Sequence, residues 1–348
     1  MTEATVRDSA TSAEKRVPSA DLLEVIDLTV RLPVEGEVRS VLRGVSLTIG
    51  AGEALGLVGE SGSGKSMMAR SVDCLLPPGA EVDGTIRFDH GDVGSLAGKE
   101  LRRYRNQVAM IFQDPRAHVN PVRTIGDFMT EALRSNLGVP AAEARRRAAD
   151  MLLQVGILDS QRRLGQYPFE LSGGLLQRAM IAAALLTEPR LLLADEPTTA
   201  LDVTTQAEVM AILDELRRRR HVAVLFITHD LDLAAAVCDR TAVMYAGQIV
   251  EVRSSSLLHD DPLHPYTAAI AAARPDIDRT ARRLLAIPGH PLSAFEADPD
   301  QCAFAPRCPH ALDECRAAAP ELIELDGGLS RCARVRELRG RLKEGQDA

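Results

Sequence analysis

A glycine-rich loop is the feature of this sequence whose chemistry is easiest to state. Residues 59–66 read Gly-Glu-Ser-Gly-Ser-Gly-Lys-Ser, which fits the pattern G-x-x-x-x-G-K-[ST]. Glycines allow such a loop to wrap a phosphate group, so that backbone N–H groups and the N-terminus of the next helix face the anion. In this pattern Lys65 reaches the β- and γ-phosphates and the Ser66 hydroxyl binds Mg²⁺. The apolar run Ala54–Val58 and the SMMARSV segment after the loop predict the strand and helix that it must join.

Two further apolar runs end in side chains that can act on a phosphate. Leu191–Ala194 is followed by Asp195 and Glu196, and Val222–Thr228 is followed by His229. Continuous apolar runs are typical of parallel strands buried on both faces, and the ends of such strands gather at one edge of a sheet. A carboxylate there can hold Mg²⁺, and the next one can orient or deprotonate an attacking water. We therefore expect these residues to converge on the glycine-rich loop.

The order of these motifs resembles that of ABC-transporter ATPase subunits. Between the loop and the acidic pair lie Gln113 in MIFQDP and the signature LSGGLLQR at Leu171–Arg178, and a D-loop at residues 200–202 and then His229 follow the pair. The resemblance covers about residues 22–265. It implies an α/β fold, a P-loop ABC ATPase with a RecA-like core and a helical signature subdomain at about 115–184.

The resemblance also implies roles for individual residues. Glu196 is expected to be the catalytic base, His229 to contact the γ-phosphate, and Gln113 to join the metal shell and sense a transmembrane partner. The Mg²⁺ ligands are expected to be Ser66, Gln113 and Asp195. Nucleotide contacts are expected from Gly59, Glu60, Ser61, Gly62, Ser63, Gly64, Lys65, Ser66, Met67 and Asp195. Signature contacts, to ATP held by an opposing subunit, are expected from Ser172, Gly173, Gly174 and Gln177.

Two segments depart from the pattern that this family commonly shows. Relatives often stack adenine on an aromatic residue 25–30 positions before the phosphate loop, whereas here that region offers Arg31 and Leu32, and no aromatic residue precedes Phe88. The Arg31 guanidinium can stack on a base in place of a ring. The signature has Leu175 and Leu176 where relatives often carry a basic residue at the second position.

Composition limits the class of protein and its partners. The chain has 348 residues and 41 Lys and Arg against 49 Asp and Glu, a net charge of −8. It lacks the basic footprint of a nucleic-acid-binding protein, so we expect no nucleic-acid partner. Residues 1–21 are polar, without the apolar core of a signal peptide, and predict a flexible tail. No apolar stretch reaches the 18–20 or so residues of a membrane span, which predicts a cytoplasmic protein. The four arginines at 217–220 are expected to form a solvated helix end.

The C-terminal part, residues 266–348, is predicted to be a small module with four cysteines. DPLHPYTAAI, at Asp261–Ile270, and the cysteine run that follows resemble the C-terminal extension of oligopeptide/dipeptide importer ATPases. The spacing C-x5-C-x6-C-x16-C leaves three alternatives open: a [4Fe–4S] cluster, Zn²⁺, or unligated thiols. The cysteines are Cys302, Cys308, Cys315 and Cys332. Cys74 and Cys238 are expected to be buried apolar residues, and His264 and His310 to have surface or capping roles.

Taken together, the resemblance implies an ATP-hydrolysing subunit of an ABC importer for oligopeptides or dipeptides, with ATP and Mg²⁺ as cofactors. An importer of nickel or another small solute is the alternative, and a non-transport ABC ATPase of translation or repair is disfavoured. The chain has one phosphate loop, so it must pair with itself or with a second ABC ATPase subunit. The expected complex adds two transmembrane permease subunits and an extracellular solute-binding protein. This places the chain, as a peripheral subunit, at the cytoplasmic face of the membrane.

Overall fold

The computed structural model describes residues 21–198, 201–273 and 287–342. The predicted tail at 1–21, apart from its last residue, lies outside the described residues, as does Ala200 of the D-loop. No helix within the described ranges is both long and apolar enough to cross a membrane.

An eight-stranded sheet forms the centre of the molecule, in the order β11-β12-β10-β9-β3-β8-β7-β6. Its five strands β9, β3, β8, β7 and β6 are parallel, and β10, β12 and β11 continue it in antiparallel fashion. The parallel strands β3, β7 and β8 are buried along their whole length, as their apolar runs predict. The bounds are β3 Ala54–Val58, β6 Val108–Ile111, β7 Leu191–Asp195, β8 Ala223–Thr228, β9 Arg240–Tyr245, β10 Gln248–Ser254, β11 Ile323–Leu325 and β12 Gly328–Ser330.

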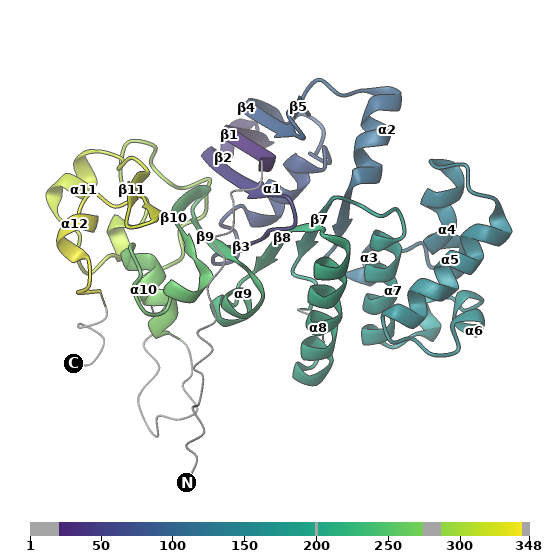
Figure 1. Cartoon of the computed structure of the whole chain (residues 1–348). Helices are drawn as coiled ribbons and strands as arrows, with labels where there is room; N and C mark the ends of the chain where they lie inside the picture. The colour runs from purple at the N-terminus through teal and green to yellow at the C-terminus, as the bar shows by residue number, and fades with distance from the viewer. Residues whose placement is uncertain (1–20, 199–200, 274–286, 343–348) are drawn as a thin grey trace, which may run out of the picture.

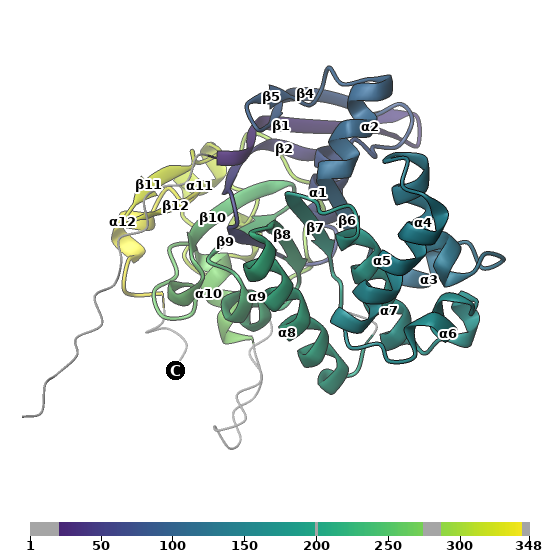
Figure 2. The same cartoon turned by 45° about the vertical axis from the view of Figure 1, so that its right-hand side comes forward.

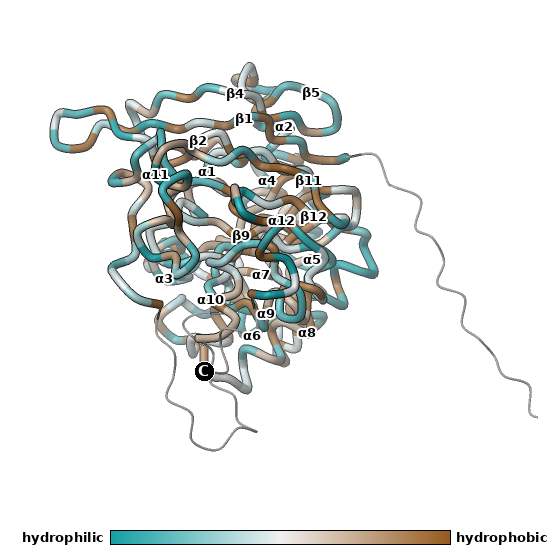
Figure 3. Tube along the Cα trace, turned by 90° about the vertical axis from the view of Figure 1, so that its left-hand side faces the viewer, coloured by the Kyte–Doolittle hydropathy of each residue, from teal (hydrophilic) through white to brown (hydrophobic). Residues whose placement is uncertain are grey.

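A second, antiparallel sheet of four strands, β2-β1-β4-β5, lies at the top of Figure 1. Helix α1 lies beneath it, and the core between the two sheets includes the fully buried Leu23, Leu42, Leu57 and Met68. In Figure 3 brown segments run through the interior, whereas the outermost loops are mostly teal. The bounds are β1 Asp21–Val34, β2 Glu37–Gly50, β4 Glu81–Phe88, β5 Gly91–Asp92, α1 Lys65–Val72 and α2 Gly98–Gln107.

Helices dominate residues 115–185, close to the predicted helical region at 115–184. They lie at the opposite end of the molecule from the C-terminal segment (Figures 1 and 2). Helices α4, α5 and α7 pack on one another through apolar faces that include the buried Leu133, Leu152 and Leu185. The bounds are α3 Pro115–His118, α4 Ile125–Ser135, α5 Ala141–Gln154, α6 Ser160–Leu164, η1 Pro168–Glu170 and α7 Gly173–Leu185.

The C-terminal segment joins the central sheet through β12, whose Ser330 and Leu329 pair with Glu251 and Val252 of β10. A division into an ATPase domain at 22–265 and a module at 266–348 stays a prediction, since the strands of this segment extend the same sheet. The remaining bounds are α8 Val203–Arg220, α9 Leu231–Val237, η2 Ser255–Leu257, α10 Pro265–Ala272, η3 Ala305–Arg307, α11 Asp313–Ala317 and α12 Val335–Leu338.

Candidate functional site

The glycine-rich loop connects the end of β3 to the start of α1, as predicted. A Cβ atom at Gly59 would lie 2.2 Å from the Met244 carbonyl oxygen, so only glycine fits there. Gly64 caps α1 with a φ of +107°, a backbone conformation that residues with a side chain rarely adopt. Ser61 and Gly62 are exposed at the tip of the loop. The loop therefore presents its backbone and the N-terminus of an eight-residue helix at one point, the arrangement that binds phosphate.

Lys65 lies inside this loop. Its Nζ donates hydrogen bonds to the carbonyl oxygens of Gly59 at 2.8 Å and Glu60 at 2.9 Å. Burial lowers the pKa of Lys65, and the carboxylates of Glu196, Asp195 and Glu60 oppose that shift. The side chain is thus a buried cation held by neutral carbonyl groups, which a phosphate group can replace.

Ser66 and Asp195 meet although 129 residues separate them. The Ser66 hydroxyl donates a hydrogen bond to Asp195 Oδ1 at 3.1 Å. Burial raises the pKa of Asp195, while the Ser66 hydrogen bond and the charges of Arg70 and Lys65 lower it. A hydroxyl and a carboxylate beside a phosphate loop are oxygen ligands of the kind that Mg²⁺ prefers. This donor set fits the predicted Mg²⁺ site.

Glu196 is the centre of a second polar group at the same edge of the sheet. Gln113 Nε2 donates a hydrogen bond to Glu196 Oε2 at 2.9 Å, and His229 Nδ1 lies 3.7 Å from the same oxygen. The Glu196 backbone has a φ of +45° and its N–H donates to the carbonyl oxygen of Ile227 at 3.0 Å. Gln113 and His229 are exposed, so this group is open to a ligand. The three predicted catalytic residues are brought together, with Gln113 bound to Glu196.

The signature residues lie in a different part of the molecule. Ser172 is the N-cap of α7 and its hydroxyl accepts a hydrogen bond from the Leu175 N–H at 3.4 Å. A Cβ at Gly174 would lie 2.7 Å from Thr205 Cγ2 of α8, so glycine allows these helices to approach. Gln177 is buried. Helix α7 packs against α3, α4, α5, α8 and β6, whereas α1 packs against β2, β7 and β8. Ser172 is exposed, which leaves it accessible to another molecule.

The two residues at the expected adenine position, Arg31 and Leu32, already contact other parts of the protein. Arg31 forms an ion pair with Asp83 across β1 and β4, and Leu32 packs against the core beneath the four-stranded sheet. The Arg31 guanidinium is therefore engaged with a carboxylate, and stacking on a base would require it to leave that partner.

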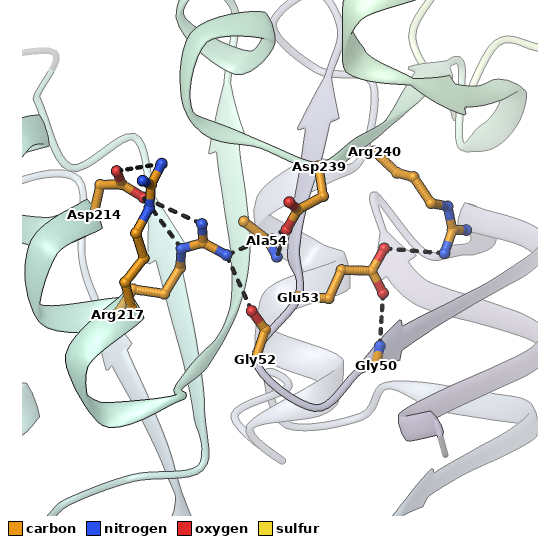
Figure 4. Close-up of polar contacts among 9 residues, drawn as sticks. Gly50, Gly52, Glu53, Ala54, Asp214, Arg217, Asp239 and Arg240 are labelled. Carbon is orange, nitrogen blue, oxygen red and sulfur yellow. Dashed lines mark hydrogen bonds and ion pairs between the residues drawn. The ribbon is translucent and has the colours of Figure 1, made fainter. Parts of the chain in front are cut away.

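The arginine run at 217–220 is only partly the solvated helix end that the sequence predicts. Arg217 contacts Asp214, Asp239 and the Gly52 carbonyl oxygen, and so ties α8 to the turn before β3 (Figure 4). Arg220 donates to the carbonyl oxygen of Leu185 at 3.2 Å. Of the four arginines, only Arg218 and Arg219 are largely exposed, because Arg217 and Arg220 turn toward neighbouring segments.

The four C-terminal cysteines line one pocket. Backbone N–H groups at residues 304, 305, 310 and 334 hydrogen-bond to the sulfur atoms of Cys302, Cys308 and Cys332. Burial raises the pKa of Cys308 to about 11 and that of Cys332 to about 12. Within the described residues no group of three or more His, Cys, Asp or Glu side chains is arranged to hold a metal ion. The cysteines share a pocket, therefore, without forming a closed ligand set for one ion such as Zn²⁺.

The predictions for two histidines and for the two remaining cysteines have mixed outcomes. His264 caps α10 by accepting a hydrogen bond from the Tyr266 N–H at 3.0 Å, which confirms the capping role, but it is buried. Cys238 is buried as predicted, whereas Cys74 is only half-buried; it follows α1 and has a φ of +55°. His310 lines the cysteine pocket.

Sequence reasoning missed a contact between the phosphate loop and the C-terminal segment. Arg307, beside Cys308, forms an ion pair with Glu60, and Tyr266 accepts a hydrogen bond from the Glu60 N–H. The contact joins residues 247 positions apart. An arginine among the cysteines was the only local signal for it.

Comparisons with known proteins agree with this geometry. Residues 42–199 match the ABC transporter family, and residues 250–315 match the C-terminal region of oligopeptide/dipeptide transporters. The oligopeptide transport ATP-binding protein OppD of Salmonella typhimurium is 41% identical over 326 residues, which are 93% of this chain and 97% of that protein. The probable peptide ABC transporter ATP-binding protein y4tR of Sinorhizobium fredii is 46% identical over 316 residues, 89% of this chain and 94% of that protein.

Solved structures extend the comparison to the fold. The dimeric bacterial ABC transporter cassette MJ0796 superposes with a TM-score of 0.60 at 28% identity, over 67% of this chain and 98% of that one. The protein cbiO1 of Clostridium perfringens, part of the ABC transporter complex cbiONQ, gives a TM-score of 0.58 at 26% identity, over 68% of this chain and 89% of that one. The chain therefore belongs to the ABC transporter family of ATP-binding proteins, in the group that carries the oligopeptide/dipeptide transporter C-terminal region.

Proposed function

We propose that the chain is the ATP-hydrolysing subunit of an importer for oligopeptides or dipeptides. The observation that carries this proposal is the meeting of two polar groups at one edge of the parallel sheet. One group joins Ser66 to Asp195, and the other joins Gln113 and His229 to Glu196. Lys65, inside the phosphate loop, is attracted by the carboxylates of Glu196 and Asp195, one from each group. Phosphoryl transfer to water needs these parts: a cradle, a metal site and a residue that positions the water.

In the proposed reaction the protein groups mainly position and stabilise. Lys65 and the N-terminus of α1 bind the phosphates of ATP. Ser66, Asp195 and Gln113 would hold Mg²⁺, which would supply charge neutralisation at the phosphate oxygens. Glu196 accepts a proton from the attacking water, and Gln113 fixes the carboxylate in place. His229 donates a hydrogen bond to the γ-phosphate. The exposed position of His229 leaves it free to turn toward that group.

A second ATPase domain completes the proposed site. Ser172 is exposed at the N-terminus of α7, a helix of 13 residues, and such an end attracts an anion. In the proposed dimer the residues Ser172, Gly173 and Gly174 bind the γ-phosphate of ATP held by the opposing subunit. The related cassette MJ0796 is described as dimeric, which supports this arrangement. The partner is a second ABC ATPase subunit or another copy of this chain.

A groove beside Gln113 is the proposed docking surface for a permease. It lies between the end of β6, α3, α4 and α7, and its lining includes Phe112, Phe128 and Met180. Phe112 stacks on His118 with ring centres 3.9 Å apart, and Gln113 follows Phe112 in the chain. A segment of a permease in this groove would therefore press on the residue that holds Glu196. This is how the chain would attach to the cytoplasmic face of the membrane and transmit hydrolysis to two permeases.

The C-terminal pocket is proposed to hold a [4Fe–4S] cluster. Four cysteines face one pocket, and backbone N–H groups donate to the sulfur atoms of three of them, Cys302, Cys308 and Cys332, which opposes the rise in pKa that burial causes. A cluster is larger than one ion, so its ligands stand further apart than those of Zn²⁺. That difference agrees with the lack of a single-ion ligand group among the described residues. When bound, the cluster would cross-link turns of a segment that has little apolar core of its own.

Transport of labelled peptide into vesicles tests the proposal. The chain is combined with its two permeases, a second ATPase subunit and a solute-binding protein, and ATP with Mg²⁺ is supplied on the ATPase side. Uptake of a dipeptide or oligopeptide that requires ATP is the expected result. Uptake of Ni²⁺ without peptide would move the assignment to the small-solute alternative. An absence of both ATP hydrolysis and uptake would refute the proposal.

A further inference from the structure

Every polar group of Glu60 in the phosphate loop is held by a partner. Its carbonyl oxygen accepts from Lys65 Nζ at 2.9 Å, and its N–H donates to the Tyr266 hydroxyl at 3.0 Å. Its carboxylate receives both ends of the Arg307 guanidinium, Nη1 to Oε2 at 2.7 Å and Nη2 to Oε1 at 3.1 Å. Two of these partners, Tyr266 and Arg307, lie in α10 and η3, C-terminal to all the ATPase motifs described above. Residues of α10 and η3 therefore hold the start of the phosphate loop in place through Glu60.

Arg307 is itself fixed in position. Its Nε donates to the Pro288 carbonyl oxygen at 3.0 Å, and Nη1 also lies 3.3 Å from the Tyr245 hydroxyl. A Cβ at Gly289 would come within 3.2 Å of Arg307 Cγ, so the arginine stem fills the space that glycine leaves. The Arg307 side chain is 4% exposed. A bidentate pair whose arginine is buried and whose carboxylate is 27% exposed is held in one geometry more firmly than a fully exposed ion pair.

Aromatic rings form the base on which this contact rests. Tyr245, Tyr266 and Phe304 pack with ring centres 4.6 to 5.3 Å apart, and they come from β9, α10 and the turn before η3. They account for three of the eleven Phe and Tyr residues in a chain without tryptophan. Aromatic residues have few rotatable bonds, so the cluster gives Tyr266 and Arg307 a rigid base. This cluster lies where the C-terminal segment meets the phosphate loop.

We propose that Arg307 is a positioning residue for ATP binding, acting through Glu60 on the phosphate loop. It keeps the loop start in place while Lys65 exchanges its carbonyl partners for phosphate oxygens. Arg307 precedes Cys308 directly, so the cysteine pocket and the phosphate loop are linked through adjacent residues. The inference rests on the proposed ATP site and adds the C-terminal segment to it.

A purely structural ion pair is the alternative, and a matched arginine separates the two roles. Arg253 is 3% exposed and pairs with Asp261 at 2.5 Å, in the same part of the chain and without contact to the phosphate loop. Removal of either buried arginine leaves an uncompensated carboxylate and lowers stability. Only removal of Arg307 is expected to change the affinity for ATP.

The experiment measures the Kd for ATP with Mg²⁺ by calorimetry, using the full chain in a Glu196→Gln background that slows hydrolysis. Arg307→Met and Glu60→Gln are each expected to weaken ATP binding about ten-fold, as a displaced loop would. The double variant is expected to bind no more weakly than Arg307→Met, because both changes break one contact. Arg307→Lys keeps the charge and is expected to recover part of the loss. Arg253→Met is expected to stay within about two-fold of the parent.

The outcomes distinguish the inference from the function on which it rests. If the parent binds ATP and folded Arg307→Met and Glu60→Gln bind it equally well, the positioning role is wrong. An equal loss in Arg253→Met would also overturn it, since the effect would then be one of stability. If Arg307→Met does not fold, Glu60→Gln decides, because it changes one charge and keeps the shape of the side chain. If the parent does not bind ATP, the proposed function fails first.

Discussion

Gln113 Nε2 donates a hydrogen bond to Glu196 Oε2 across 2.9 Å, and this contact joins the loop after β6 to the end of β7. The two strands are parallel neighbours, paired from Val108 with Leu191 to Ile111 with Ala194, so their ends reach the same edge. Gln113 is exposed and adjoins the groove that we assign to a permease. A movement in that groove can therefore change the orientation of the proposed catalytic base. One hydrogen bond therefore joins the proposed coupling residue, Gln113, to the proposed base, Glu196.

Substitution Glu196→Gln tests the base directly. Glutamine keeps the size of the side chain and removes its ability to accept a proton, so ATP hydrolysis is expected to fall at least ~100-fold. Binding of ATP is expected to be retained, because Lys65 and the loop are unchanged. Phosphate release and ATP binding are measured on the same preparation. Glu215→Gln, on the exposed side of α8, is the control and should hydrolyse ATP at the parent rate. Near-normal hydrolysis in Glu196→Gln would refute the assignment.

The cysteine pocket makes a prediction that can be read without transport. Protein purified without oxygen is expected to be brown, to absorb near about 400 nm and to contain about four iron atoms per chain. Cys308→Ser is expected to lose most of this iron, because it removes one of the four thiolates in the pocket. Cys238→Ser, at the buried C-cap of α9 and outside the cysteine pocket, is the control and should keep the iron. Colourless, iron-free protein with full ATPase activity would exclude the cluster.

Local patterns predict the proposed site better than they predict its surroundings. The phosphate loop, Asp195, Glu196 and His229 were expected together because parallel strand ends meet at one edge, and that rule needs no knowledge of distant residues. The contact of Arg307 with Glu60 spans 247 positions and follows no periodic pattern, so the sequence alone could not reveal it. The four-stranded sheet was missed for a similar reason. Strands β1 and β2 contain apolar runs, but β4 and β5 are mostly polar or exposed, and the antiparallel pairing of all four depends on packing over α1.

The arginine run shows the same limit at a single helix end. Four consecutive arginines at 217–220 suggest a solvated surface, yet a helix turns about 100° per residue, so two of the four must face back toward the protein. Arg217 and Arg220 do so, and contact the carbonyl oxygens of Gly52 and Leu185. The arginine run therefore predicted the end of the helix correctly, but it predicted the wrong environment for two of the four arginines.

Arg217 is therefore expected to matter for stability more than its exposed neighbour. Its side chain is 10% exposed and holds Asp239, whose carboxylate also accepts from the Ala54 N–H at the start of β3 (Figure 4). Arg217→Met leaves these acceptors without a cation and is expected to cost about 2–4 kcal/mol of unfolding free energy. Arg218 is 70% exposed, and Arg218→Met is expected to change the free energy of unfolding by less than about 0.5 kcal/mol. Denaturant unfolding of both variants makes the comparison. If both variants lost the same unfolding free energy, burial of the arginine would not determine how much it stabilises the protein.

The raised pKa of Asp73 leads us to expect that the stability of the fold depends on pH. It caps α1 and is buried, and burial raises its pKa to about 7, with Arg105 opposing the shift. The unfolded chain releases this proton near pH 3.9. Between about pH 4 and 7 the folded state thus holds a proton that the unfolded state lacks, so the contribution of Asp73 is greatest below pH 4 and is lost as pH rises through 7.

Asp73→Asn removes this charge and resembles the protonated acid. The variant is expected to be more stable than the parent at pH 8, by an amount on the order of a few kcal/mol, because the parent then buries a carboxylate. At pH 5 the folded parent is already protonated, and the gain is expected to shrink. Thermal unfolding at both pH values measures the difference in Tm. Asp150→Asn, at an exposed position on α5, is the control and should shift Tm little at either pH. A gain for Asp73→Asn that is the same at pH 5 and pH 8 would contradict the raised pKa, because the charge would then be present in the folded state at both values.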